Sequence, residues 1–60
     1  MTKIRDLRVD DIWVEHGHTR RITSTPRPVV GSYAFDTVLL PGTATEYHEL
    51  PGDLEVETVR

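Results

Sequence analysis

A chain of 60 residues without cysteine is long enough for one small domain, and neither a disulfide nor a cysteine-ligated metal can reinforce its core. Its formal net charge of −3 argues against non-specific nucleic-acid binding, which depends on neutralising phosphates. No apolar run approaches the roughly 18 residues of a membrane span, and residues 1–6 lack the hydrophobic segment of a signal peptide. We therefore expect a single domain over residues 1–60, located in the cytoplasm.

The charges are distributed unevenly along the chain. Residues 1–30 carry six Lys or Arg against four Asp or Glu, whereas residues 31–60 carry one Arg against six acidic residues. If the two halves occupied different faces, the molecule would be a dipole suited to an oriented protein partner. The alternative is that the charges solvate a β surface and protect its edges from pairing.

The first predicted element is a short strand over residues 3–6. Ile4 and Leu7 are one helical turn apart, but no helical period continues beyond them, and so short a helix would be marginally stable. We expect residues 7–10 to form an irregular approach to the next strand.

The next predicted element is a β-hairpin whose turn contains Gly17. A three-residue loop over residues 15–17 would give Gly17 the left-handed conformation of a type I turn with a G1 bulge. It would also keep the apolar residues Ile12, Val14 and Ile22 on one face. A two-residue loop would shift the register by one position and separate Ile22 from the other two. We therefore predict the three-residue loop.

This register determines the expected position of Trp13. Because side chains alternate between the two faces of a strand, Trp13 would point away from the core that Ile12 and Val14 enter. On that outer face Trp13 would lie beside Arg21, and Asp11 would pair with Arg21 as opposite charges. The alternative is that Trp13 caps an end of the barrel or packs beneath a neighbouring loop.

The middle of the chain contains a connection followed by a long apolar stretch. Two prolines in residues 23–28 remove strand donors, so we predict a connection there. Residues 29–40 are predicted to form a strand with a β-bulge near residues 36–37, where the large side chains change from odd to even positions. A turn at residues 31–32 that divides this stretch into two strands is the alternative.

Two Pro-Gly turns divide the rest of the chain. Residues 41–42 suit the centre of a type II turn, residues 45–50 form a predicted strand, and residues 51–53 repeat the turn chemistry. Residues 54–59 alternate as expected for a half-buried strand. About five short strands joined by tight turns, with no credible helix, predict an all-β fold: a small antiparallel barrel or a strongly bent sheet.

The opening of the predicted hairpin resembles a known family. Residues 7–14, Leu-Arg-Val-Asp-Asp-Ile-Trp-Val, together with a Gly-containing turn and Arg20-Arg21-Ile22, resemble the start of SH3-like small barrels, including KOW-type modules. That family introduces the strand with Leu-x-x-Gly-Asp, whereas this sequence has Asp10 in place of the glycine, and no ligand-binding signature of SH3 domains is present. The resemblance implies an SH3-like barrel. The short length and composition also resemble accessory proteins of actinobacteriophages, which would place the protein in the host cytoplasm.

Candidate catalytic and metal-binding groups are few. His16 and His18 flank a glycine, where side chains diverge, so we expect exposed turn histidines rather than a zinc or copper site. A second interpretation is that these two imidazoles and His48 confer pH sensitivity. Ser24 and Ser32 lack a nucleophile elbow, and no glycine-rich phosphate loop exists. We therefore expect no enzymatic activity, no metal and no cofactor.

The remaining functional signal is an aromatic side chain beside guanidinium groups. Trp13, Arg20, Arg21 and Tyr47 are the predicted partner-binding residues. Exposed aromatics with arginines are enriched at the hot spots of protein interfaces, and they can also stack the bases of single-stranded nucleic acid.

Three functions are compatible with this signal. We expect a non-enzymatic protein-interaction module, a phage accessory protein that docks on a host or phage protein through the Trp13 face. The first alternative is a nucleic-acid-binding barrel that also uses Arg5 and Arg8. The second alternative is a self-assembling subunit that pairs its exposed sheet edges.

Overall fold

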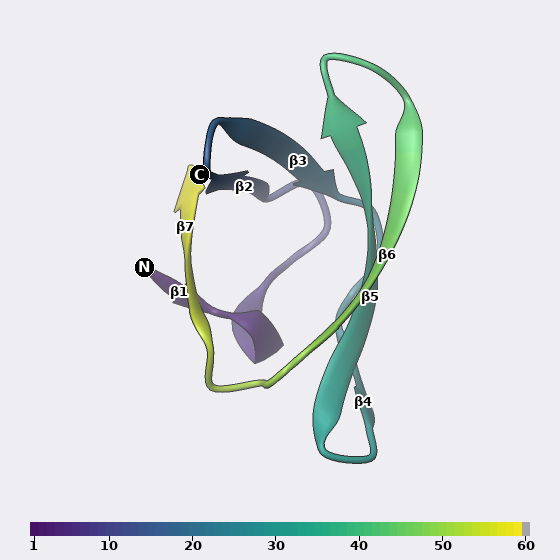
Figure 1. Ribbon diagram of the computed structural model, residues 1–60. Helices are drawn as coiled ribbons and strands as arrows, with labels where there is room; N and C mark the ends of the chain where they lie inside the picture. The colour runs from purple at the N-terminus through teal and green to yellow at the C-terminus, as the bar shows by residue number, and fades with distance from the viewer. Residues whose placement is uncertain (60) are drawn as a thin grey trace.

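The computed structural model describes residues 1–59, and these residues form an all-β structure (Figure 1). The strands are β1 (Thr2–Lys3), β2 (Ile12–Glu15), β3 (His18–Ile22), β4 (Arg27–Val29), β5 (Ser32–Leu40), β6 (Ala44–Leu50) and β7 (Glu55–Val59). A 3-10 turn, η1 (Ile4–Asp6), follows β1. No helix within residues 1–59 has the length and apolar character needed to cross a membrane.

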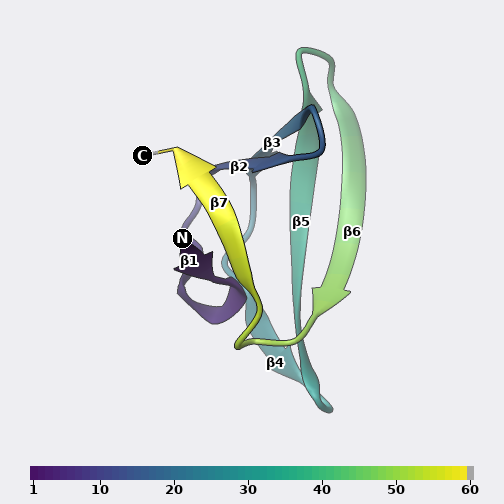
Figure 2. The ribbon, with the colours of Figure 1, turned by 60° about the vertical axis from the view of Figure 1, so that its left-hand side comes forward.

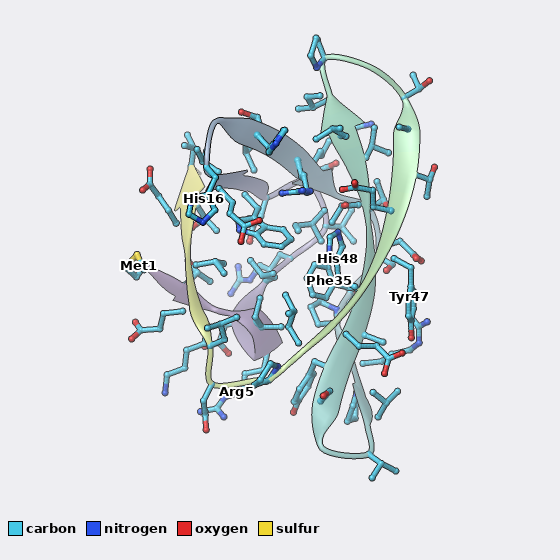
Figure 3. The ribbon with its side chains drawn as sticks, in the orientation of Figure 1. Met1, Arg5, His16, Phe35, Tyr47 and His48 are labelled. Carbon is cyan, nitrogen blue, oxygen red and sulfur yellow. The ribbon has the colours of Figure 1, made fainter. Side chains whose placement is uncertain are left out.

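All pairings in the sheet are antiparallel. The order is β1-β7-β2-β3-β5-β4, and β6 pairs with the other side of β5. The sheet curls strongly, so that β7 and β1 face β5 and β6 across an interior that side chains fill (Figures 1 and 3). This curled half-barrel confirms the predicted all-β, strongly bent antiparallel sheet. It has seven strands rather than about five, and two of them, β1 and β4, are very short.

The β2–β3 hairpin has a two-residue turn, so the predicted three-residue loop is wrong. Glu15 pairs with His18, and Trp13 pairs with Arg20. His16 and Gly17 form the turn with φ angles of 47° and 80°. Positive φ at both central positions is typical of a type I′ turn, whose twist matches that of the flanking strands. The His-Gly pair therefore selects the tighter turn.

The change of register by one residue exchanges the two faces of β2 relative to β3. Trp13 and Ile22 are only 3% and 0% exposed and lie on the concave face, whereas Ile12 and Val14 lie on the convex face. The predicted core position of Ile12 and Val14, with Trp13 outside, is therefore wrong. The predicted pairing of Asp11 with Arg21 is also wrong, because Arg21 pairs with Ile12.

The hydrophobic core occupies the concave side of the sheet. It consists of Ile4, Leu7, Trp13, Ile22, Phe35 and Val56, with Tyr33 and Leu50 packed against it. The predicted strand over residues 3–6 is limited to β1, because the chain turns at η1. Ile4 and Leu7 use their one-turn spacing there to enter the core together, and the Ile4 amide donates to the Leu54 carbonyl at 2.9 Å.

The apolar stretch over residues 29–40 is divided by a turn, as in the alternative considered for it, although the turn lies at residues 30–31 rather than 31–32. β4 and β5 are joined through Val30 and Gly31, and the β5–β6 register stays constant through residues 36–37, so the predicted bulge is wrong. The apparent phase change arises because a polar residue, Thr37, takes a fully buried core position. Its hydroxyl lies 3.0 Å from Nε2 of His48, which satisfies it there.

We predict that Gly17→Ala destabilises the protein by about 1 to 2 kcal/mol, because an L side chain is strained at positive φ. Gly42→Ala is the matched control. Its new Cβ would lie 3.7 Å from the Leu39 carbonyl oxygen, an ordinary van der Waals contact. Urea denaturation of the wild type and both variants measures the difference. Equal unfolding midpoints for the two variants would contradict the type I′ turn.

Candidate functional site

The four predicted partner-binding residues lie on opposite faces of the sheet. Trp13 and Arg20 are cross-strand partners on the concave face. Arg21, the next residue in β3, and Tyr47, opposite Asp36 in β6, lie on the convex face. Figure 3 shows Tyr47 directed away from the interior, whereas His48 and Phe35 point into it. The structure therefore brings together only half of the predicted site on each face.

Arg20 is the centre of a charged cluster on the concave face. Its guanidinium lies 5.0 Å from the centroid of the Trp13 ring, a cation–π contact. Its Nε donates to Oε1 of Glu46 at 2.6 Å, and its Nη1 donates to Oε1 of Glu15 at 3.3 Å. The side chain is only 12% exposed. Two carboxylates and an indole ring thus hold one largely buried positive charge.

His48 completes this cluster from β6. Its ring stacks on Phe35, with centroids 5.2 Å apart and planes 22° apart, and meets the Trp13 ring edge-on at 5.1 Å. Its Nε2 lies 3.7 Å from Oε1 of Glu46. Burial, followed by the nearby charge of Arg20, lowers the pKa of His48. The hydrogen bond from Arg20 lowers the pKa of Glu46.

The cluster contains a hydroxyl, an imidazole and a carboxylate, but not in the order that a catalytic triad needs. The Thr37 hydroxyl and the Glu46 carboxylate both face the same nitrogen, Nε2 of His48. A relay needs the nucleophile on one ring nitrogen and the carboxylate on the other. The Thr37 side chain is also fully buried, which keeps substrate away from it.

The histidines are divided between the surface and the core. His16 lies in the turn and His18 follows it as the first residue of β3. Both are exposed, as predicted, while the side chain of His48 is only 17% exposed. Within residues 1–59, no three His, Cys, Asp or Glu side chains are arranged to hold a metal ion.

Ion pairs connect the basic and acidic halves of the chain. Arg5 contacts Asp53, and Arg20 contacts Glu46. Each pair joins a residue of the first thirty to one of the last thirty. Strand pairing also places β7 between β1 and β2, so the two halves interleave in the sheet instead of occupying separate faces, which was the condition for the predicted dipole.

A shallow cleft of about 600 Å³ lies beside η1 and carries charges of both signs. Lys3, Arg5 and Arg8 line it together with Asp6 and Glu55. The β1–β7 pairing places Lys3 directly opposite Glu55. This alternation of charge offers no continuous positive track for phosphates.

The convex face carries a group of apolar side chains, two of which, Ile12 and Val14, the predicted register assigned to the core. We call them the convex stripe: Ile12, Val14, Val38, Leu40 and Val59, with Arg21 among them. Cross-strand pairing forms one row from Val59 through Ile12 and Arg21 to Val38. Val14 and Leu40 lie in the next row, each paired with Thr19. The stripe crosses β7, β2, β3 and β5, and its Val59 end is 57% exposed.

The sequence contains a signal for this stripe, the His16-Gly17 turn, which the alternation of hydrophobic residues does not take into account. In the two-residue register that was set aside, Ile12 and Val14 share a face opposite to Ile22. Recognising His-Gly as a type I′ turn would have selected that register and placed these side chains outside the Trp13 core.

No protein-family model matches this sequence, and comparison with curated proteins and with solved structures finds no significant similarity. The resemblance to SH3-like barrels therefore stays a prediction. Asp10, which stands where the motif of that family has glycine, adopts a φ of 76°, the left-handed region that favours glycine.

We predict that Trp13→Ala destabilises the protein by about 3 to 5 kcal/mol, because it opens a large cavity in the core. A domain of this size has a margin of only a few kcal/mol, so the variant should be largely unfolded. Near-ultraviolet and far-ultraviolet circular dichroism during urea denaturation provides the measurement. Val30→Ala, at a fully exposed side chain in the β4–β5 turn, is the control and should unfold like the wild type. A folded Trp13→Ala with an unchanged midpoint would rule out the core position of Trp13.

We predict that acidification destabilises the fold through His48. Its pKa is lowered in the folded state, so the unfolded chain binds the proton more readily. Stability is then complete above the ordinary histidine value of about 6.5 and falls as the pH decreases from there toward the lower folded pKa. Glu46 adds a loss in the same direction at lower pH.

The test compares the free energy of unfolding at about pH 7.5 and about pH 5.5 in the wild type and in His48→Asn. The difference between the two pH values should be smaller in the variant, whatever its absolute stability. An identical difference in both proteins would assign the pH dependence to other groups.

Proposed function

We propose that the protein is a non-enzymatic protein-interaction module that docks on its partner through the convex stripe. The observation that carries this proposal is the contiguity of the stripe. Ile12, Val14, Val38 and Leu40 are half-buried and Val59 is exposed. Strand register joins them across four strands into one apolar patch, and such patches are characteristic of interaction sites.

The position of Arg21 supports a partner that presents a carboxylate within an apolar surface. Arg21 is exposed and lies between Ile12 and Val38 in the row that runs from Val59 to Val38. The ion pairs found among residues 1–59 involve Arg5 and Arg20 but not Arg21. A guanidinium beside apolar side chains is typical of protein interfaces, where it forms a charge-assisted pair with an acidic group.

Protein binding is better supported than nucleic-acid binding. Of the arginines considered for a phosphate track, Arg20 is held by two carboxylates inside the concave face and Arg5 contacts Asp53. Trp13 is buried and offers no ring face for a base. The likeness in length and composition to phage accessory proteins supports a host or phage protein as the partner.

We predict that Arg21→Glu and Val59→Ser each weaken partner binding by about tenfold or more while the fold is retained, because both side chains are exposed. Val30→Ser is the matched control, since Val30 is fully exposed in the β4–β5 turn, outside the stripe. Partners are captured from nuclease-treated bacterial lysate with all four proteins, and the captured protein is then purified and titrated calorimetrically.

A protein captured and bound equally by wild type, Arg21→Glu and Val59→Ser would exclude the convex stripe as the docking surface. Capture that depends on intact nucleic acid would favour the nucleic-acid alternative.

A further inference from the structure

β6 has an open edge along its whole length. Its seven residues pair with β5 on one side, and none of the described strands pairs with the other side. Figures 1 and 2 both show this side of β6 at the outer margin of the sheet. The strands at the two ends of the sheet order are much shorter, because β1 has two residues and β4 has three, one of them a proline.

The backbone groups that face this edge can be identified from the bonds of Asp36. The Asp36 carbonyl accepts from the Thr23 amide at 2.9 Å, and the Asp36 amide donates to Oγ of Ser24 at 2.8 Å. Both groups therefore point away from β6. In an antiparallel pair, directly opposite residues exchange either both hydrogen bonds or none. Tyr47, opposite Asp36, is thus unbonded to β5, and its N–H and C=O point to the open edge.

Alternation along the strand extends this result to the neighbours two positions away. The outward amides and carbonyls of β6 belong to Thr45, Tyr47 and Glu49. None of these groups takes part in the other backbone hydrogen bonds of the described residues. β6 itself contains no proline and no bulge, which are two of the usual devices that prevent edge pairing.

The sequence of β6 is complementary to itself when it is reversed about Tyr47. In antiparallel pairing with a second copy, Tyr47 meets Tyr47, Glu46 meets His48, Thr45 meets Glu49, and Ala44 meets Leu50. The aromatic residue thereby meets an aromatic residue, the two apolar residues meet each other, and no two carboxylates stand opposite each other. The neighbouring symmetric register, centred on Glu46, would place two carboxylates opposite each other.

We propose that β6 pairs antiparallel with β6 of a second copy of this chain, with the two-fold axis at Tyr47. The axis passes through a hydrogen-bonded pair, as the outward groups of Tyr47 require, and the pairs of Thr45 with Glu49 add bonds on both sides. The interface is isologous, so every contact occurs twice. It uses the sheet edge rather than the convex stripe, and it therefore goes beyond the proposed function.

The test removes one outward donor from the edge. Thr45→Pro eliminates the amide that would donate to the Glu49 carbonyl of the other copy, whereas Thr45→Ala keeps that amide and is the matched control. Two lost hydrogen bonds per dimer should weaken dimerisation by about tenfold or more. Sedimentation equilibrium from about 1 μM to about 1 mM measures the dissociation constant. Wild type and Thr45→Ala should approach twice the monomer mass of 6.8 kDa.

Tyr47→Lys provides a second test that leaves the backbone unchanged. The two-fold axis would place both lysines opposite each other, so dimerisation should weaken by about tenfold or more, while the exposed side chain leaves the monomer folded. A wild type that stays at 6.8 kDa over the whole range would overturn the proposal. So would a dimer that persists unchanged in Thr45→Pro and Tyr47→Lys. Partner binding through the convex stripe is measured separately and does not depend on either result.

Discussion

The two-residue turn formed by His16 and Gly17 determines which side chains of the hairpin become the core. Positive φ at both positions sets the pairing of Glu15 with His18, and every cross-strand pair of β2 and β3 follows from it. Trp13 and Ile22 then enter the concave side. A slip of one residue would bring Ile12 and Val14 inside and expel the tryptophan, so the position of the largest core side chain depends on this turn.

The same register carries a charged residue into the interior together with Trp13. Arg20 packs over the indole ring, and Glu46 and Glu15 neutralise it. An uncompensated buried charge would be costly, so the acidic residues of β2 and β6 are part of the structure of the core. His48 and Thr37 satisfy each other in the same layer. This polar layer connects the hairpin to β6.

Placing Trp13 inside leaves other side chains available for binding. The convex stripe around Arg21 and the open edge of β6 are separate features, one made of side chains and the other of backbone groups. A half-barrel produces both features at once. Its curl buries only the concave face, and because the sheet does not close, β6 has no neighbouring strand on the side away from β5. The proposed partner docking and the proposed pairing of two copies therefore use different parts of one surface.

The sequence by itself determined the all-β class, the strand-turn-strand organisation, the exposed turn histidines and the alternation of β7, because these depend on local turn chemistry and on a period of two. It did not determine which face of each strand is buried. Ile12 and Val14 looked like core, and Arg20 looked like surface, since hydrophobicity predicts burial only on average. Only the tertiary structure decided this, through the rings of Phe35 and His48 that pack on Trp13 and through Glu46, a carboxylate distant in sequence that makes a buried arginine acceptable.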